Sequence, residues 1–161
     1  VDNINSFMGK MGYTNIHLQG KLMVSKETDN TSQSSRNYSY ASPRDMSKLI
    51  KDVKDYEILN NDHTKDFFEI MKKQHFKTDM IGRYLGYDPE DSESDLEIYS
   101  KSGSIRGVRN DVGVVQSGDN SYIVSLMSKD CEDRRFYPEN EAQVVLGSIS
   151  QEIYEWFMEM M

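Results

Sequence analysis

The strongest local indication of chemistry is the run Lys101-Ser102-Gly103-Ser104, which ends one predicted strand and leads into the next. It places a cationic side chain, two hydroxyl groups and a residue without a Cβ atom next to one another. Alone, such a run is common, and an exposed strand end followed by a turn is its simpler interpretation. Its meaning therefore depends on the sequence around it.

The stretch from Lys101 to Val115 resembles the hairpin that carries the Lys-Thr/Ser-Gly motif in penicillin-recognising serine hydrolases, especially class A β-lactamases. The resemblance implies that Lys101 is catalytic and places a positive charge beside the nucleophile and the substrate carboxylate. It implies that Ser102 binds that carboxylate and that Gly103 lets substrate lie along the strand as an extra strand would. Ser104 completes the substrate-binding run.

Three further stretches extend the resemblance over nearly the whole chain. Arg109-Asn-Asp-Val-Gly113 follows at the spacing of the family's Asn-Asp strand. The segment Tyr38–Ile50 looks like the family's Ser-Pro-x-Asp-Met helix after the omega loop, and Asn5–Thr14 looks like its helix ending in Leu-Gly-x-x-x-Thr.

Two charged residues of the same hairpin are interpreted differently. Arg109 resembles the arginine that in several class A enzymes reaches the substrate carboxylate from the neighbouring strand, and a guanidinium can bind a carboxylate through two hydrogen bonds. An exposed cross-strand charge partner is an equally good interpretation of Arg109. We expect Asp111 to be structural and paired locally within the hairpin.

The motifs that would complete an active site are missing from the sequence. No serine has a lysine three residues later, and no Ser-Asp-Asn triplet occurs. The stretch Leu18–Glu27, at the place of the omega loop, lacks Glu-x-x-Leu-Asn, so a D,D-peptidase-like role stays open beside β-lactamase. The sequence thus looks like the C-terminal portion of a class A-like enzyme, and this chain alone is expected to be inactive because acyl transfer needs an activated nucleophile.

The resemblance implies a serine hydrolase that, when intact, acts through an acyl-enzyme on β-lactam or D-Ala-D-Ala amide bonds. It implies no cofactor, and a location outside the cytoplasm, secreted or membrane-tethered. The alternative is a non-catalytic binding or sensor module that holds a carboxylate-bearing peptidoglycan-like peptide in the groove from Lys101 to Arg109. A third interpretation is an unrelated α+β interaction domain.

Composition narrows the classes of partner. The 161 residues include 27 acidic and 19 basic side chains, a formal net charge of −8, which disfavours nucleic-acid and anionic-membrane binding. The single Cys131 excludes an internal disulfide. We expect no metal site, because the three histidines show no ligand spacing and the acidic run Asp88–Asp95 lacks the glycine and final glutamate of a calcium loop.

The first part of the chain reads as helices joined by polar loops. Apolar residues from Ile4 to Met11 recur at helical spacing before Gly12, and Ser42-Pro43 starts a second helix with Met46, Leu49, Ile50 and Val53 inward. A third helix is predicted from His63 to about Gln74. Its inward residues are expected to be Phe67, Ile70 and Met71. Residues Ser25–Ser39, between the first two helices, are expected to form a polar loop.

The second part reads as an antiparallel three-stranded meander with runs around Leu96–Ser100, Val108–Val115 and Tyr122–Leu126, separated at Gly103, Gly107 and a tight hairpin at Gly118–Asn120. A final helix opens near Pro138 and presents an apolar stripe to the sheet. The order of these elements predicts an α+β fold. Residues 1–94 are expected to form a helical part with an omega-like loop, and residues 95–161 the sheet and the last helix. Together they would make one incomplete domain. Its open edge should pair with the N-terminal portion of the same protein or with a second copy.

Overall fold

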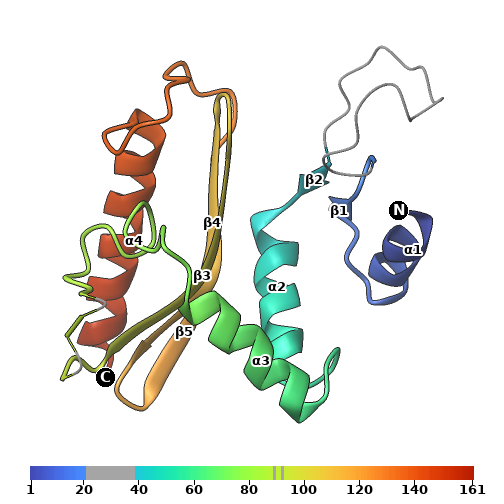
Figure 1. The fold of residues 1–161 in the computed structure, drawn as a ribbon, viewed down its shortest axis with the longest axis horizontal. Helices are drawn as coiled ribbons and strands as arrows, with labels where there is room; N and C mark the ends of the chain where they lie inside the picture. The colour runs from blue at the N-terminus through green and yellow to red at the C-terminus, as the bar shows by residue number, and fades with distance from the viewer. Residues whose placement is uncertain (21–38, 89, 92) are drawn as a thin grey trace. The chain divides into compact units, whose positions relative to one another are not determined.

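The computed structural model describes residues 1–20, 39–88, 90–91 and 93–161, and the α+β prediction is confirmed (Figure 1). Two compact units divide the chain, Val1–Met46 and Ser47–Met161. In chain order the elements are α1 (Asp2–Lys10), β1 (Ile16–His17), β2 (Tyr40–Ala41), α2 (Pro43–Lys54), α3 (Asn61–Lys72), β3 (Leu96–Ile105), β4 (Val108–Ser117), β5 (Asn120–Met127) and α4 (Glu141–Glu159).

The first unit contains α1, the short antiparallel pair β1–β2 and the start of α2. Gly12, which ends the α1 region, has a φ of +80°, as its predicted place after a helix requires. The side chain of Asn5 accepts from the Leu18 N–H (2.8 Å) and donates to the Leu18 carbonyl oxygen (2.9 Å), which ties α1 to the segment after β1. The omega-like stretch, apart from its first three residues, and nearly all of the predicted polar loop lie outside the described residues.

The two helices α2 and α3 begin with side-chain caps. Ser42 Oγ accepts from the Asp45 N–H at 3.1 Å, as predicted, and Asn60 Oδ1 accepts from the His63 N–H at 2.9 Å. The expected inward face of α3 is partly wrong, because Ile70 is 64% exposed. The buried face instead follows positions i, i+4 and i+7, which are Thr64, Phe68 and Met71.

The predicted meander is confirmed, with strand order β3-β4-β5 and antiparallel pairing throughout. Two-residue turns at Arg106-Gly107 and Gly118-Asp119 connect the strands, and both glycines have a positive φ. Gly103 does not separate two strands as expected. It lies inside β3 opposite Asn110, because the ladder continues to Ile105.

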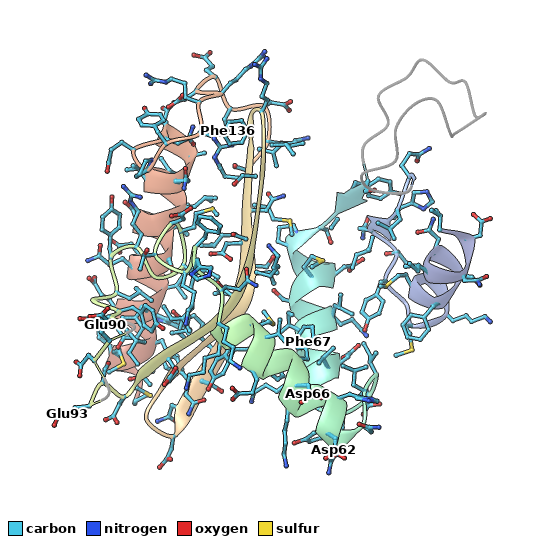
Figure 2. The ribbon with its side chains drawn as sticks, in the orientation of Figure 1. Asp62, Asp66, Phe67, Glu90, Glu93 and Phe136 are labelled. Carbon is cyan, nitrogen blue, oxygen red and sulfur yellow. The ribbon has the colours of Figure 1, made fainter. Side chains whose placement is uncertain are left out.

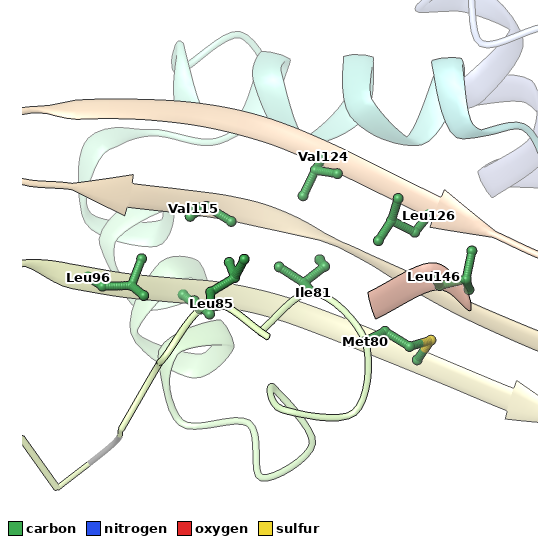
Figure 3. Close-up of a cluster of buried hydrophobic side chains, with 9 residues drawn as sticks. Met80, Ile81, Leu85, Leu96, Val115, Val124, Leu126 and Leu146 are labelled. Carbon is green, nitrogen blue, oxygen red and sulfur yellow. The ribbon is translucent and has the colours of Figure 1, made fainter. Parts of the chain in front are cut away.

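One face of the sheet carries the main core. Side chains from all three strands meet α4 and the segment that follows α3 (Figure 3). Ser150 Oγ of α4 donates to the Ile81 carbonyl oxygen at 2.8 Å, which fixes that segment to the helix. The cluster consists of Met80, Ile81, Leu85, Leu96, Ile98, Val115, Val124, Leu126 and Leu146.

The opposite face of β3 is covered by α3. The rings of Phe68 and Tyr99 meet edge to face with centroids 6.0 Å apart, and Lys72 Nζ lies 2.9 Å from Glu97 Oε1. Side chains alternate between the two faces along a strand. This alternation explains why Tyr99 contacts α3 while Ile98 joins the main core.

The last helix starts later than expected and uses a narrower buried face. It begins at Glu141, with Asn140 Oδ1 accepting from the Ala142 N–H at 3.2 Å, rather than near Pro138. The residues buried along its length are Ala142, Gln143, Leu146, Gly147 and Ser150. Part of the predicted sheet-facing stripe is therefore on the surface, namely Val145, Ile149, Trp156 and Met160.

Candidate functional site

A pocket of about 500 Å³ lies along β3, which is an outer strand of its sheet. All of its walls come from the second compact unit. The run predicted from the sequence, Lys101 to Ser104, forms one wall, and β4, the segment after α3, the loop before α4 and the first turn of α4 supply the others. The remaining lining residues are Phe76, Asp79, Arg109, Phe136, Tyr137, Pro138 and Gln143.

The predicted run is open to an approaching ligand. Lys101, Gly103 and Ser104 are exposed and Ser102 is half-buried. Lys101 Nζ donates to the carbonyl oxygen of Ser102, so in this structure the ammonium group folds back on its own strand. A Cβ atom placed on Gly103 would meet no other atom within 4 Å, which leaves free space beside the strand.

Arg109 lines the same pocket but is only 1% exposed, so the interpretation as an exposed charge partner is wrong. Nη1 donates hydrogen bonds to the backbone carbonyl oxygens of Ile105 and Val108, with a nitrogen–oxygen distance of 2.8 Å in each. Nη2 donates to the Arg135 carbonyl oxygen, and the guanidinium lies 4.8 Å from the centroid of the Phe136 ring. Arg109 thus fastens the hairpin to the loop before α4.

The strand register explains how Lys101 and Arg109 reach one pocket. Arg109 pairs with Ser104, so these two side chains share a face of the sheet, whereas Lys101 lies on the other face. Because β3 is an outer strand, a pocket at its edge can be lined from both faces. Phe136 lies in the loop before α4, at the end of the sheet near the β3–β4 turn (Figure 2).

Sequence reasoning missed Asp79, the carboxylate of this pocket. Burial raises the pKa of Asp79, while the charge of Arg83, a hydrogen bond from Gln143 and the charge of Arg109 oppose that rise. No motif in the sequence marks Asp79, because it enters the pocket from a segment outside the hairpin. No motif marks Phe76, Phe136 and Tyr137 either, because these aromatic lining residues also lie outside the hairpin.

Asp111 is structural, as expected, and hydrogen bonds join its carboxyl group both to Ser100 within the hairpin and to a segment outside it. The side chain is fully buried, and Oδ2 accepts from the Ile81 N–H at 3.3 Å. Burial raises the pKa of Asp111 to about 7, against hydrogen bonds that favour the carboxylate. The contact joins β4 to the segment that supplies Asp79 and so positions one wall of the pocket.

A comparison with protein families adds a decisive observation. The model of the beta-lactamase enzyme family matches residues 1–157. The chain belongs to this family. A comparison with curated proteins found no match.

Solved structures of beta-lactamase-like proteins share the fold of this family member. The beta-lactamase from Sphaerobacter thermophilus has a TM-score of 0.71 at 18% identity, over 93% of this chain and 51% of that one. PBP-A has a TM-score of 0.72 at 21% identity, and the match covers 98% of this chain and 51% of PBP-A. A mutant of PBP-A has been solved as an acyl-enzyme complex with penicillin G. Its TM-score is 0.71 at 19% identity, and the match covers 98% of this chain and 52% of the mutant chain. The chain thus spans about half the length of the structures it matches.

Among the residues that the structure describes, no group of three or more His, Cys, Asp or Glu side chains is arranged to hold a metal ion. None of the described helices combines the length and the apolar character needed to cross a bilayer.

The buried Asp111 predicts an unusual pH dependence of stability in this family member. Because its pKa rises on folding from 3.8 to about 7, the folded state binds more protons than the unfolded state between these values. Stability therefore falls as pH rises from about 4 to about 7, by about 4 kcal/mol. Urea unfolding between pH 4 and pH 8 should show this fall, and Asp111→Asn should remove most of it.

The matched control is Asp119→Asn in the exposed β4–β5 turn, which should keep the slope of the unmodified chain. A slope unchanged by Asp111→Asn would mean that the Asp111 carboxyl is already ionised at low pH in the folded protein.

Proposed function

We propose that this chain supplies the carboxylate-binding strand of a penicillin-binding serine hydrolase, of class A β-lactamase or D,D-peptidase type. The observation that carries the proposal is the pocket along β3, in which Lys101, Ser102 and Ser104 line one wall at the outer edge of the described sheet. Membership of the beta-lactamase family and the penicillin G acyl-enzyme of a PBP-A mutant support it.

The residues of the pocket suit a ligand that carries a carboxylate on an extended backbone. The Lys101 ammonium, released from the Ser102 carbonyl oxygen, offers a positive charge, and the serine hydroxyls donate hydrogen bonds to the same anion. The ligand backbone lies beside Gly103, where no side chain stands in the way. Phe76 and Phe136 offer apolar surface to the rest of the ligand.

In the intact hydrolase, a serine oxygen attacks the amide carbonyl carbon, the amine leaves with a proton, and water releases the acyl group. Ser-x-x-Lys does not occur in this chain, so we place that serine and its base in sequence beyond it. The part of this chain is to hold the substrate carboxylate, which positions the amide bond for attack.

Arg109 serves this site as a positioning residue. Its three backbone contacts hold the loop that carries Phe136 and Tyr137 against the hairpin. The predicted two-point contact with the substrate carboxylate would require Nη1 to leave two carbonyl oxygens, and we therefore assign the carboxylate to Lys101, Ser102 and Ser104.

A binding or sensor module is the second candidate function. The observation in its favour is the lack of both Ser-x-x-Lys and Glu-x-x-Leu-Asn in the chain. The pocket would then hold a carboxylate-bearing peptide without cleaving it. With the intact protein, release of D-Ala from an acyl-D-Ala-D-Ala peptide would favour the hydrolase, and retention of uncleaved peptide would favour the module.

Lys101→Met tests the proposed role of the pocket. Loss of one charge-assisted hydrogen bond should weaken non-covalent binding of benzylpenicillin by about tenfold or more, measured by isothermal titration calorimetry. Lys129→Gln, which removes a lysine charge outside the pocket, should bind as the unmodified chain does. Equal affinity of the two variants would show that the ligand carboxylate is not held by Lys101.

A further inference from the structure

A second, smaller pocket lies at the end of α3, and three of its seven lining residues are lysines. Its volume is about 270 Å³, and it shares no lining residue with the pocket along β3. No carboxylate lines it, although the chain has a formal net charge of −8. Its walls include Lys72, Lys73, His75, Lys77, Thr78 and Tyr87.

Lys77 is the unusual member of this group, because it is only 6% exposed. Its Nζ donates to Tyr87 Oη at 2.5 Å and lies 4.7 Å from the centroid of the Tyr87 ring. In the described part of the chain, no carboxylate lies within ion-pair distance of this ammonium group. An ammonium group has three donors, and burial of an unpaired charge is costly, so an anion bound here would offset that cost.

The neighbouring side chains indicate which anion fits. Lys72 is paired with Glu97 at 2.9 Å, whereas Lys73 and His75 stand exposed at the pocket. Lysines act as point charges and lack the planar two-point geometry with which arginine selects carboxylates. Together with the hydroxyl groups of Thr78 and Tyr87, they suit an oxyanion with several oxygens in different directions.

We propose that this pocket binds a phosphate group, with Lys77 as its central ligand. The pocket has room for more than the anion itself, since one water takes up about 30 Å³ in the liquid. The phosphate is therefore either a free ion or the headgroup of a small monoester. This site is independent of the proposed hydrolase function, because neither its residues nor its ligand take part in that reaction.

The test compares Lys77→Met with Lys129→Gln, two variants that each lose one positive charge. Inorganic phosphate, titrated at constant ionic strength and neutral pH by calorimetry, should bind the unmodified chain and Lys129→Gln equally. Lys77→Met keeps an unbranched side chain that is one heavy atom shorter, without the charge, and should bind phosphate about tenfold more weakly or worse. Phosphate should raise the melting temperature of the unmodified chain and leave that of Lys77→Met unchanged.

Titrations with two further ligands identify the chemical class of the bound anion. Glycerol 3-phosphate should compete with inorganic phosphate, and tighter binding of one of them distinguishes an ester from the free ion. Acetate should bind more weakly than either. Tighter binding of acetate, no phosphate binding, or equal phosphate affinity of Lys77→Met and Lys129→Gln would each overturn the proposal. If Lys77→Met does not fold, Lys73→Gln replaces it and should still lose affinity relative to Lys129→Gln.

Discussion

Incubation with benzylpenicillin is expected to leave the mass of the 161-residue chain unchanged. Covalent capture of a β-lactam needs a nucleophile that a base has activated, and no serine of this chain has a lysine three residues later. Lys101 has its ammonium on a backbone carbonyl oxygen, not on a serine hydroxyl group. Mass spectrometry of the intact chain reads the result directly.

The PBP-A mutant that has been solved as an acyl-enzyme complex with penicillin G is a suitable positive control. Under the same conditions it should gain the mass of one penicillin. A stoichiometric adduct on this chain would contradict our account of the missing nucleophile. Peptide mapping would then identify the acylated residue, beginning with Ser102 and Ser104 in the pocket.

Self-association of the chain in solution is the second large effect that we expect. Within the described residues β5 is an outer strand, and a strand edge presents unpaired backbone groups that recruit other chains. Beside the core, α4 exposes Val145, Ile149, Trp156 and Met160 along one stripe. Analytical ultracentrifugation should show association that increases with protein concentration.

Trp156→Glu should weaken this association strongly, because it places a charge at the centre of the apolar stripe. The control is Ile70→Glu, which changes an equally exposed apolar side chain on α3 and should leave association intact. A monodisperse monomer at all concentrations, with the β5 edge covered by residues of its own chain, would favour a self-sufficient α+β domain.

The parts of the fold with local signals could be predicted from the sequence. The cap at Ser42 depends on residues next to it, and the meander depends on alternating side chains and on glycines that turn at positive φ. The strand position of the run from Lys101 to Ser104 is predicted because an alternating stretch precedes the run and an apolar stretch follows the next turn. These features need no knowledge of distant contacts.

The parts that depend on distant contacts could not be predicted. The role of Arg109 depends on the carbonyl oxygen of Arg135, 26 positions away, and the role of Asp111 on the N–H of Ile81. Asp79 enters the pocket from a segment without a motif. On α4 the sequence shows more apolar residues than the sheet covers, so hydrophobic spacing alone overstated the buried face.

We propose above all that the pocket along β3 holds the carboxylate-bearing part of a penicillin or D-Ala-D-Ala ligand. The most direct measurement is a two-dimensional nuclear magnetic resonance titration of the isotopically labelled chain with benzylpenicillin. We predict that the shifted backbone resonances cluster at Lys101–Ser104 and in the wall around Phe136. Shifts confined to other regions, such as the cationic pocket around Lys77, or no shifts at millimolar ligand, would contradict the account.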